Sequence, residues 1–113
     1  MRDPRLVRLG ELIVSYSLGL EPGQILRVDV PPLAAPLGVE LYRAALAAGS
    51  HPYANVELEQ LSEILVKKGN DEQIEFLSPI AAAEIEFVDA IVTIWSESNT
   101  RALSRVPPDR HQR

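Results

Sequence analysis

Few side chains in this sequence could bind a metal or act as nucleophiles, and they are widely scattered. His51 and His111 are the only histidines, and neither has a second ligand at metal-site spacing. Cysteine is absent, which excludes thiolate chemistry and a disulfide framework. None of the serines lies in a glycine-flanked nucleophile turn. We therefore predict that this chain carries no catalytic residue, no metal ligand and no cofactor.

Nucleotide binding and carboxylate acid–base chemistry are also disfavoured. The segment after the first predicted strand contains Pro31 and Pro32 but lacks the glycines that bring a backbone close to a pyrophosphate. Glu84 and Glu86 are two residues apart in a predicted helix, so their side chains face different sides. They are therefore not expected to form a general acid/base pair.

The composition predicts one soluble globular domain. The chain has 113 residues, of which 46% are hydrophobic and 24% charged, and its net charge is −5. An acidic chain whose only adjacent basic pair is Lys67–Lys68 is not expected to bind nucleic acid. No apolar run approaches the roughly 18 residues of a membrane span. We therefore expect no membrane association. No signal-peptide core follows Met1, and the absence of cysteine is typical of a cytosolic protein, so we expect a cytoplasmic location.

Helices and strands alternate along the sequence. Asp3 and Pro4 are typical of a helix start, and the spacing places Leu6, Leu9, Ile13 and Tyr16 on one apolar face. In the next helix, Tyr42 and Leu46 are expected to widen the apolar stripe. The pattern predicts strands at 24–30, 51–58 and 90–96, and helices at 4–18, 33–48, 61–68, 70–77 and 79–87.

This order predicts an α/β fold: a small three-layer open sheet, mostly parallel, with three main strands and flanking helices. The segment 90–96 is apolar almost throughout, so we expect it to be the central strand, covered on both faces. Trp95 within it is expected to belong to the core.

Two sequence blocks resemble a known family. These are Tyr-Ser-Leu-Gly-Leu-Glu-Pro-Gly at 16–23 and Ala-Gly-Ser-His-Pro at 48–52, with further matches at 3–6, 35–37, 41–46 and 99–104. Together they are similar to the amino-terminal domain of the aminopeptidase T family of metallopeptidases, described as thermophilic metalloproteases or leucyl aminopeptidases. The resemblance implies a longer, two-domain, dimeric exopeptidase that removes residues from free peptide N-termini.

The resemblance also implies where the chemistry lies. Two divalent metal ions (zinc, cobalt or magnesium) are expected in the carboxy-terminal catalytic domain, so none of their ligands falls on this chain. The expected partners are that domain, a peptide substrate and a second copy of the protein. We interpret residues 1–105 as the amino-terminal α/β domain. Residues 106–113 are interpreted as the truncated start of the next helix or a linker, because Pro107-Pro108-Asp109 is typical of a helix start.

The expected role of this domain is to form part of the substrate-cavity wall and a packing or dimer surface. Ligands of open parallel sheets bind beyond the carboxyl ends of the strands. The substrate-cavity candidates are therefore the polar and loop residues at two such ends: Pro32, Glu97, Ser98, Asn99 and Arg101. For Ser98 and Asn99 we favour the simpler role of capping a short helix. The alternative for the whole chain is a stand-alone α/β binding domain or a receiver-like interaction domain.

Overall fold

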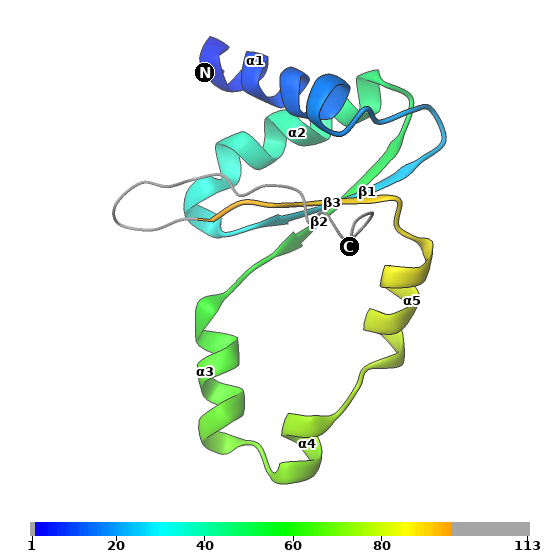
Figure 1. The fold of residues 1–113 in the computed structure, drawn as a ribbon. Helices are drawn as coiled ribbons and strands as arrows, with labels where there is room; N and C mark the ends of the chain where they lie inside the picture. Colours follow the sequence, from blue (N-terminus) through cyan, green and yellow to red (C-terminus); the bar gives the residue numbers. More distant parts are fainter. Residues whose placement is uncertain (1, 96–113) are drawn as a thin grey trace.

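A computed structural model describes residues 2–95 and shows an open, all-parallel, three-stranded sheet with helices on both sides (Figure 1). The strands are β1 (Ile25–Val30), β2 (His51–Val56) and β3 (Ala90–Thr93), in the order β2-β1-β3. The helices are α1 (Pro4–Leu12), α2 (Ala35–Ala47), α3 (Glu59–Lys68), α4 (Asp71–Glu75) and α5 (Pro79–Phe87). The predicted α/β fold class is confirmed.

The central strand is β1, which corrects the prediction for 90–96. Leu26 of β1 pairs with Pro52 of β2 on one side and with Ala90 of β3 on the other. The strand β3 lies at an edge of the sheet. Its segment is apolar because Val92 and Ile94 pack in the core. Trp95 is not a core residue, because the strand ends at Thr93 and Trp95 is 50% exposed.

Helix α1 begins as the sequence predicts and then changes its winding. The Asp3 side chain accepts a hydrogen bond from the Arg5 backbone N–H at 2.9 Å, and Pro4 occupies the first turn. After Leu12 the chain forms a π-helical turn over Ile13–Ser17. The wider turn shifts the apolar face, so that Ile13 and Val14 are buried and Tyr16 is exposed, contrary to prediction.

The core lies between the sheet and the α1/α2 layer. Leu26, Val28 and Val30 alternate along β1 toward this layer, where they meet Leu37, Leu41 and Ala45 of α2. The predicted stripe of α2 is narrower than expected, because Tyr42 and Leu46 are exposed. Gly49 follows α2 at φ 83°, the left-handed conformation that glycine adopts without strain. The chain then enters β2.

Residues 58–87, which contain α3, α4 and α5, form an arch on the other side of the sheet (Figure 1). We call this segment the helical excursion. Asn70 and Gln73 make the predicted capping box of α4, which ends at Glu75 rather than at residue 77. Ser78 caps α5 by accepting hydrogen bonds from the backbone N–H groups of Ile80 and Ala81. None of the three helices contains a buried residue.

Candidate functional site

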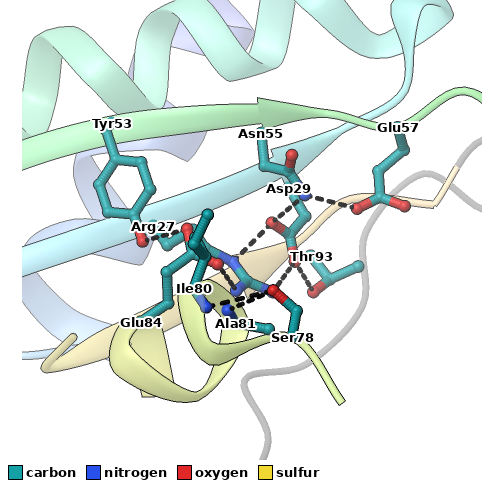
Figure 2. Close-up of polar contacts among 10 residues, drawn as sticks. All are labelled: Arg27, Asp29, Tyr53, Asn55, Glu57, Ser78, Ile80, Ala81, Glu84 and Thr93. Atoms are coloured by element: carbon teal, nitrogen blue, oxygen red, sulfur yellow. Dashed lines mark hydrogen bonds and ion pairs between the residues drawn. The ribbon is translucent and has the colours of Figure 1, made fainter. Parts of the chain in front are cut away.

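The face of the sheet turned away from the core carries polar side chains at alternate strand positions. Arg27 and Asp29 of β1 occupy this face, since their neighbours Leu26, Val28 and Val30 belong to the core. The parallel register places Arg27 beside Tyr53, and Asp29 beside Asn55 and Thr93. The sheet register thus brings these polar groups into one cluster (Figure 2).

Arg27 and Asp29 form a two-pronged ion pair within one strand. The Arg27 Nε donates to Asp29 Oδ1 at 2.8 Å, and its Nη2 donates to Oδ2 at 2.9 Å. The side chains are 18% and 6% exposed, so the pair is largely removed from water. The hydrogen bonds to Asp29, together with its negative charge and that of Glu84, raise the pKa of Arg27. Such a fork is a strong form of charge-assisted hydrogen bond.

Asp29 accepts from both neighbouring strands as well. The Asn55 amide lies 3.4 Å from Asp29 Oδ1, and the Thr93 hydroxyl lies 3.3 Å from Oδ2. Asn55 also donates to Glu57 Oε2 at 3.1 Å, just beyond the end of β2. A buried carboxylate is therefore held by donors from all three strands (Figure 2).

Glu84 of α5 joins the helical excursion to this cluster. Its Oε1 accepts from Arg27 Nη1 at 3.2 Å, and its Oε2 accepts from the Tyr53 hydroxyl at 3.0 Å. Burial raises the pKa of Tyr53, and the hydrogen bond to Glu84 and the charge of that carboxylate raise it further. Both effects favour the neutral phenol. Glu84 and Glu86 do face different sides, as predicted, because Glu84 turns to the sheet while Glu86 is exposed.

This cluster does not have the donor set of a metal centre. The Asp29 carboxylate already binds the Arg27 guanidinium through both oxygens, and Glu84 accepts a hydrogen bond from the third guanidinium nitrogen, Nη1. A divalent ion would have to displace that cation. Among residues 2–95, no group of three or more His, Asp or Glu side chains could hold a metal ion. The metals that a metallopeptidase requires therefore do not fit this cluster, which is suited to fixing the excursion against the sheet.

One predicted substrate-cavity residue can be placed. Pro32 is exposed and begins a 3₁₀ turn, Pro32–Ala34, directly after the carboxyl end of β1. Its contact with substrate stays a prediction. The other candidates, Glu97, Ser98, Asn99 and Arg101, lie outside the described residues, as do His111 and the predicted boundary at 105. His51 is exposed at the first position of β2.

The Arg27–Asp29–Glu84 cluster was not predicted from the sequence. The available signal was a pair of opposite charges at positions i and i+2 of a predicted strand, which places them on the same face. The neighbouring positions Tyr53, Asn55 and Thr93 could not be aligned with that pair, because the strand register depends on tertiary packing.

The comparisons with known proteins assign the chain to the metallopeptidases. It belongs to the family described as thermophilic metalloprotease (M29), which matches residues 2–113. Among solved structures it is similar to wild-type AmpT from Thermus thermophilus, with a TM-score of 0.58 and 21% sequence identity. The similarity covers 95% of this chain and 28% of that chain. No curated protein matches the sequence.

The family match confirms the resemblance that the two sequence blocks predicted. At 21% identity, the similarity to AmpT shows a shared fold and nothing more. Among the described residues, no helix is both long and apolar enough to cross a membrane.

Proposed function

We propose that this chain is the amino-terminal, non-catalytic domain of a metal-dependent aminopeptidase that removes residues from the free N-termini of peptides. The family match over residues 2–113 carries this proposal. The chain spans 28% of the AmpT chain that it resembles, which supports a role as one part of a larger enzyme. Two divalent ions (zinc, cobalt or magnesium) would be held by the carboxy-terminal catalytic portion.

The role proposed for this domain is structural. The carboxyl edge of the sheet, with Pro32 after β1 and Glu57 after β2, would form part of the substrate-cavity wall. The Asn55 side-chain amide would stabilise that edge, because it donates both to Asp29 of the central strand and to Glu57 after β2. The enzyme is further proposed to act as a homodimer in the cytoplasm.

A longer polypeptide that joins this chain to the catalytic portion of an M29 enzyme tests the proposed activity. With zinc, cobalt or magnesium added, it should release the first residue from a leucyl peptide. The same peptide with an acetylated N-terminus should be left intact, because an aminopeptidase selects a free amine. Cleavage of both peptides at internal bonds would instead identify an endopeptidase and refute the proposal.

A further inference from the structure

The helical excursion exposes an unusual amount of apolar surface. Eleven large apolar side chains between residues 58 and 87 are exposed, and Leu77 and Ile80 reach 89% and 75%. The eleven are Leu58, Leu61, Ile64, Leu65, Val66, Ile74, Phe76, Leu77, Ile80, Ile85 and Phe87. An apolar surface gathered on one segment is typical of a site that another polypeptide covers.

The described part of the chain does not cover this surface. Within the excursion, Leu65 of α3 and Ile74 of α4 both lie close to Gly69, and both side chains are nevertheless exposed. Toward the sheet, α5 presents the carboxylate of Glu84 to Arg27 and Tyr53, which is a polar contact. The apolar faces of α3 and α5 thus contribute little to the domain's own core.

The charge of the excursion indicates what kind of surface would cover it. Residues 58–87 contain seven acidic side chains and two lysines, which gives a net charge of 2 − 7 = −5. The acids are Glu59, Glu63, Asp71, Glu72, Glu75, Glu84 and Glu86. Lys67 lies 3.9 Å from Glu63, and Glu84 is paired with Arg27 of the sheet. The acids available to a partner are therefore Glu59, Asp71, Glu72, Glu75 and Glu86, which we call the acidic rim. Two copies of such a surface would repel each other, whereas a basic rim would complement it.

We propose that the helical excursion is a docking surface for a polypeptide surface with an apolar centre and a rim of Lys and Arg. The identity of the partner rests on the proposed function, because we assign the partner surface to the catalytic portion of the aminopeptidase. The apolar side chains provide the contact area, and the acidic rim selects the partner. A second copy of this chain is not the occupant.

Two synthetic 18-residue amphipathic helices serve as probes. Both have the same leucine face, flanked by lysines in one peptide and by glutamates in the other. Isothermal titration of residues 1–113 in about 50 mM NaCl should show binding of the lysine peptide at least about tenfold tighter than binding of the glutamate peptide. The preference should shrink as salt is raised toward about 1 M, where the screening length falls to about 3 Å.

Paired variants locate the binding surface. Leu61→Ser combined with Ile64→Ser should weaken lysine-peptide binding about tenfold or more, because both side chains lie on the exposed face of α3. Leu12→Ser combined with Val39→Ser removes similar exposed apolar groups outside the excursion and should leave binding unchanged. Glu72→Gln with Glu75→Gln should reduce the preference for lysine, whereas Glu11→Gln with Glu21→Gln should not.

Three results would overturn the proposal: no binding of either peptide, equal binding of both, or binding unaffected by the Leu61/Ile64 variant. A fourth would identify a different occupant. In light scattering at about 50 mM NaCl, a stable dimer that the Leu61/Ile64 variant dissociates would show that a second copy covers the surface. None of these measurements depends on peptidase activity. The docking surface can therefore be refuted while the proposed aminopeptidase function stands, and the function can be refuted while the docking surface stands.

Discussion

Arg27 and Asp29 bind each other through two hydrogen bonds, at 2.8 and 2.9 Å, although they belong to the same strand and are only two residues apart. Their common face is the side of the sheet away from the core. The pair therefore fixes the position of the Arg27 guanidinium on this face. Glu84 of α5 binds the same guanidinium, so the pair also holds the helical excursion against the sheet.

Removal of the guanidinium should destabilise the domain strongly. Arg27→Met leaves the Asp29 carboxylate buried without its cation, and breaking a buried pair from one side costs about 3 kcal/mol or more. Urea unfolding should show this loss, while the exposed control Arg8→Met should change the unfolding free energy by less than about 0.5 kcal/mol. The double variant Arg27→Leu with Asp29→Leu should cost less than Arg27→Met alone. A larger loss in the double variant would contradict this account of the pair.

Glu84 should control the attachment of α5. Glu84→Ala removes the acceptor of the Arg27 and Tyr53 hydrogen bonds, so the backbone amides of α5 should exchange with solvent about tenfold faster. Glu86→Ala, two residues later on the exposed side of α5, is the matched control and should leave exchange unchanged. Equal exchange in the two variants would show that Glu84 does not hold the helix.

The phenol of Tyr53 should titrate above the ordinary tyrosine value of 10.0, because burial and Glu84 raise its pKa. Ultraviolet titration of tyrosinate should resolve one of the three tyrosines at the higher pH, and Tyr53→Phe should remove that step. Glu84→Ala should lower the pKa, whereas Glu86→Ala should not. By linkage, Tyr53 stabilises the fold fully below pH 10, and this contribution is lost as pH rises toward its folded pKa.

The ion pair between Arg2 and Glu40 should make the fold sensitive to acid. The hydrogen bond from Arg2 and its positive charge lower the pKa of Glu40 below 4.5. A lowered carboxyl pKa stabilises the fold above the unfolded value, and that stability is lost as pH falls below about 4.5 through the folded pKa. Thermal unfolding at several pH values should show a shallower acid limb for Glu40→Gln and for Arg2→Gln. An unchanged limb in both would contradict the assignment.

Gly10 lies where α1 packs closely against the backbone of α2. A Cβ added at Gly10 would lie 3.0 Å from the backbone C and O of Glu40, which cannot move as a side-chain end can. Gly10→Ala should gain about 1 kcal/mol of helix propensity, yet overpacking should lower the unfolding free energy by about 1–2 kcal/mol net. Urea unfolding measures this, with Glu11→Ala on the exposed side as the control. A stabilised Gly10→Ala protein would refute the close packing.

The fold was predictable where local chemistry determines structure. The cap at Asp3, the capping box of Asn70 and Gln73, and the turn at Gly49 each depend on neighbouring residues, and each is observed. The family resemblance was likewise readable, because its two motif blocks are short and continuous. The order of the strands could not be predicted, because an apolar segment such as 90–94 can be buried at an edge of the sheet as well as at its centre.

The polar cluster and the surface of the excursion were not predictable for a different reason. The periodicity of Leu61, Ile64 and Leu65 indicates an apolar helix face but does not say which polypeptide covers it. Likewise, Arg27 and Glu84 are 57 residues apart and meet only through the packing of α5 against the sheet. Tyr16 was misplaced because a π-helical turn changes the helical period without a clear sequence signal.

We propose that the hydrolytic chemistry of the parent enzyme lies outside residues 1–113. The most direct measurement is an assay of leucine release from a leucyl peptide by the purified polypeptide of residues 1–113, with zinc, cobalt and magnesium supplied in turn. We expect no release above the buffer blank with any of the three ions. Metal-dependent release of leucine that is removed by a chelator and restored by added metal would contradict it.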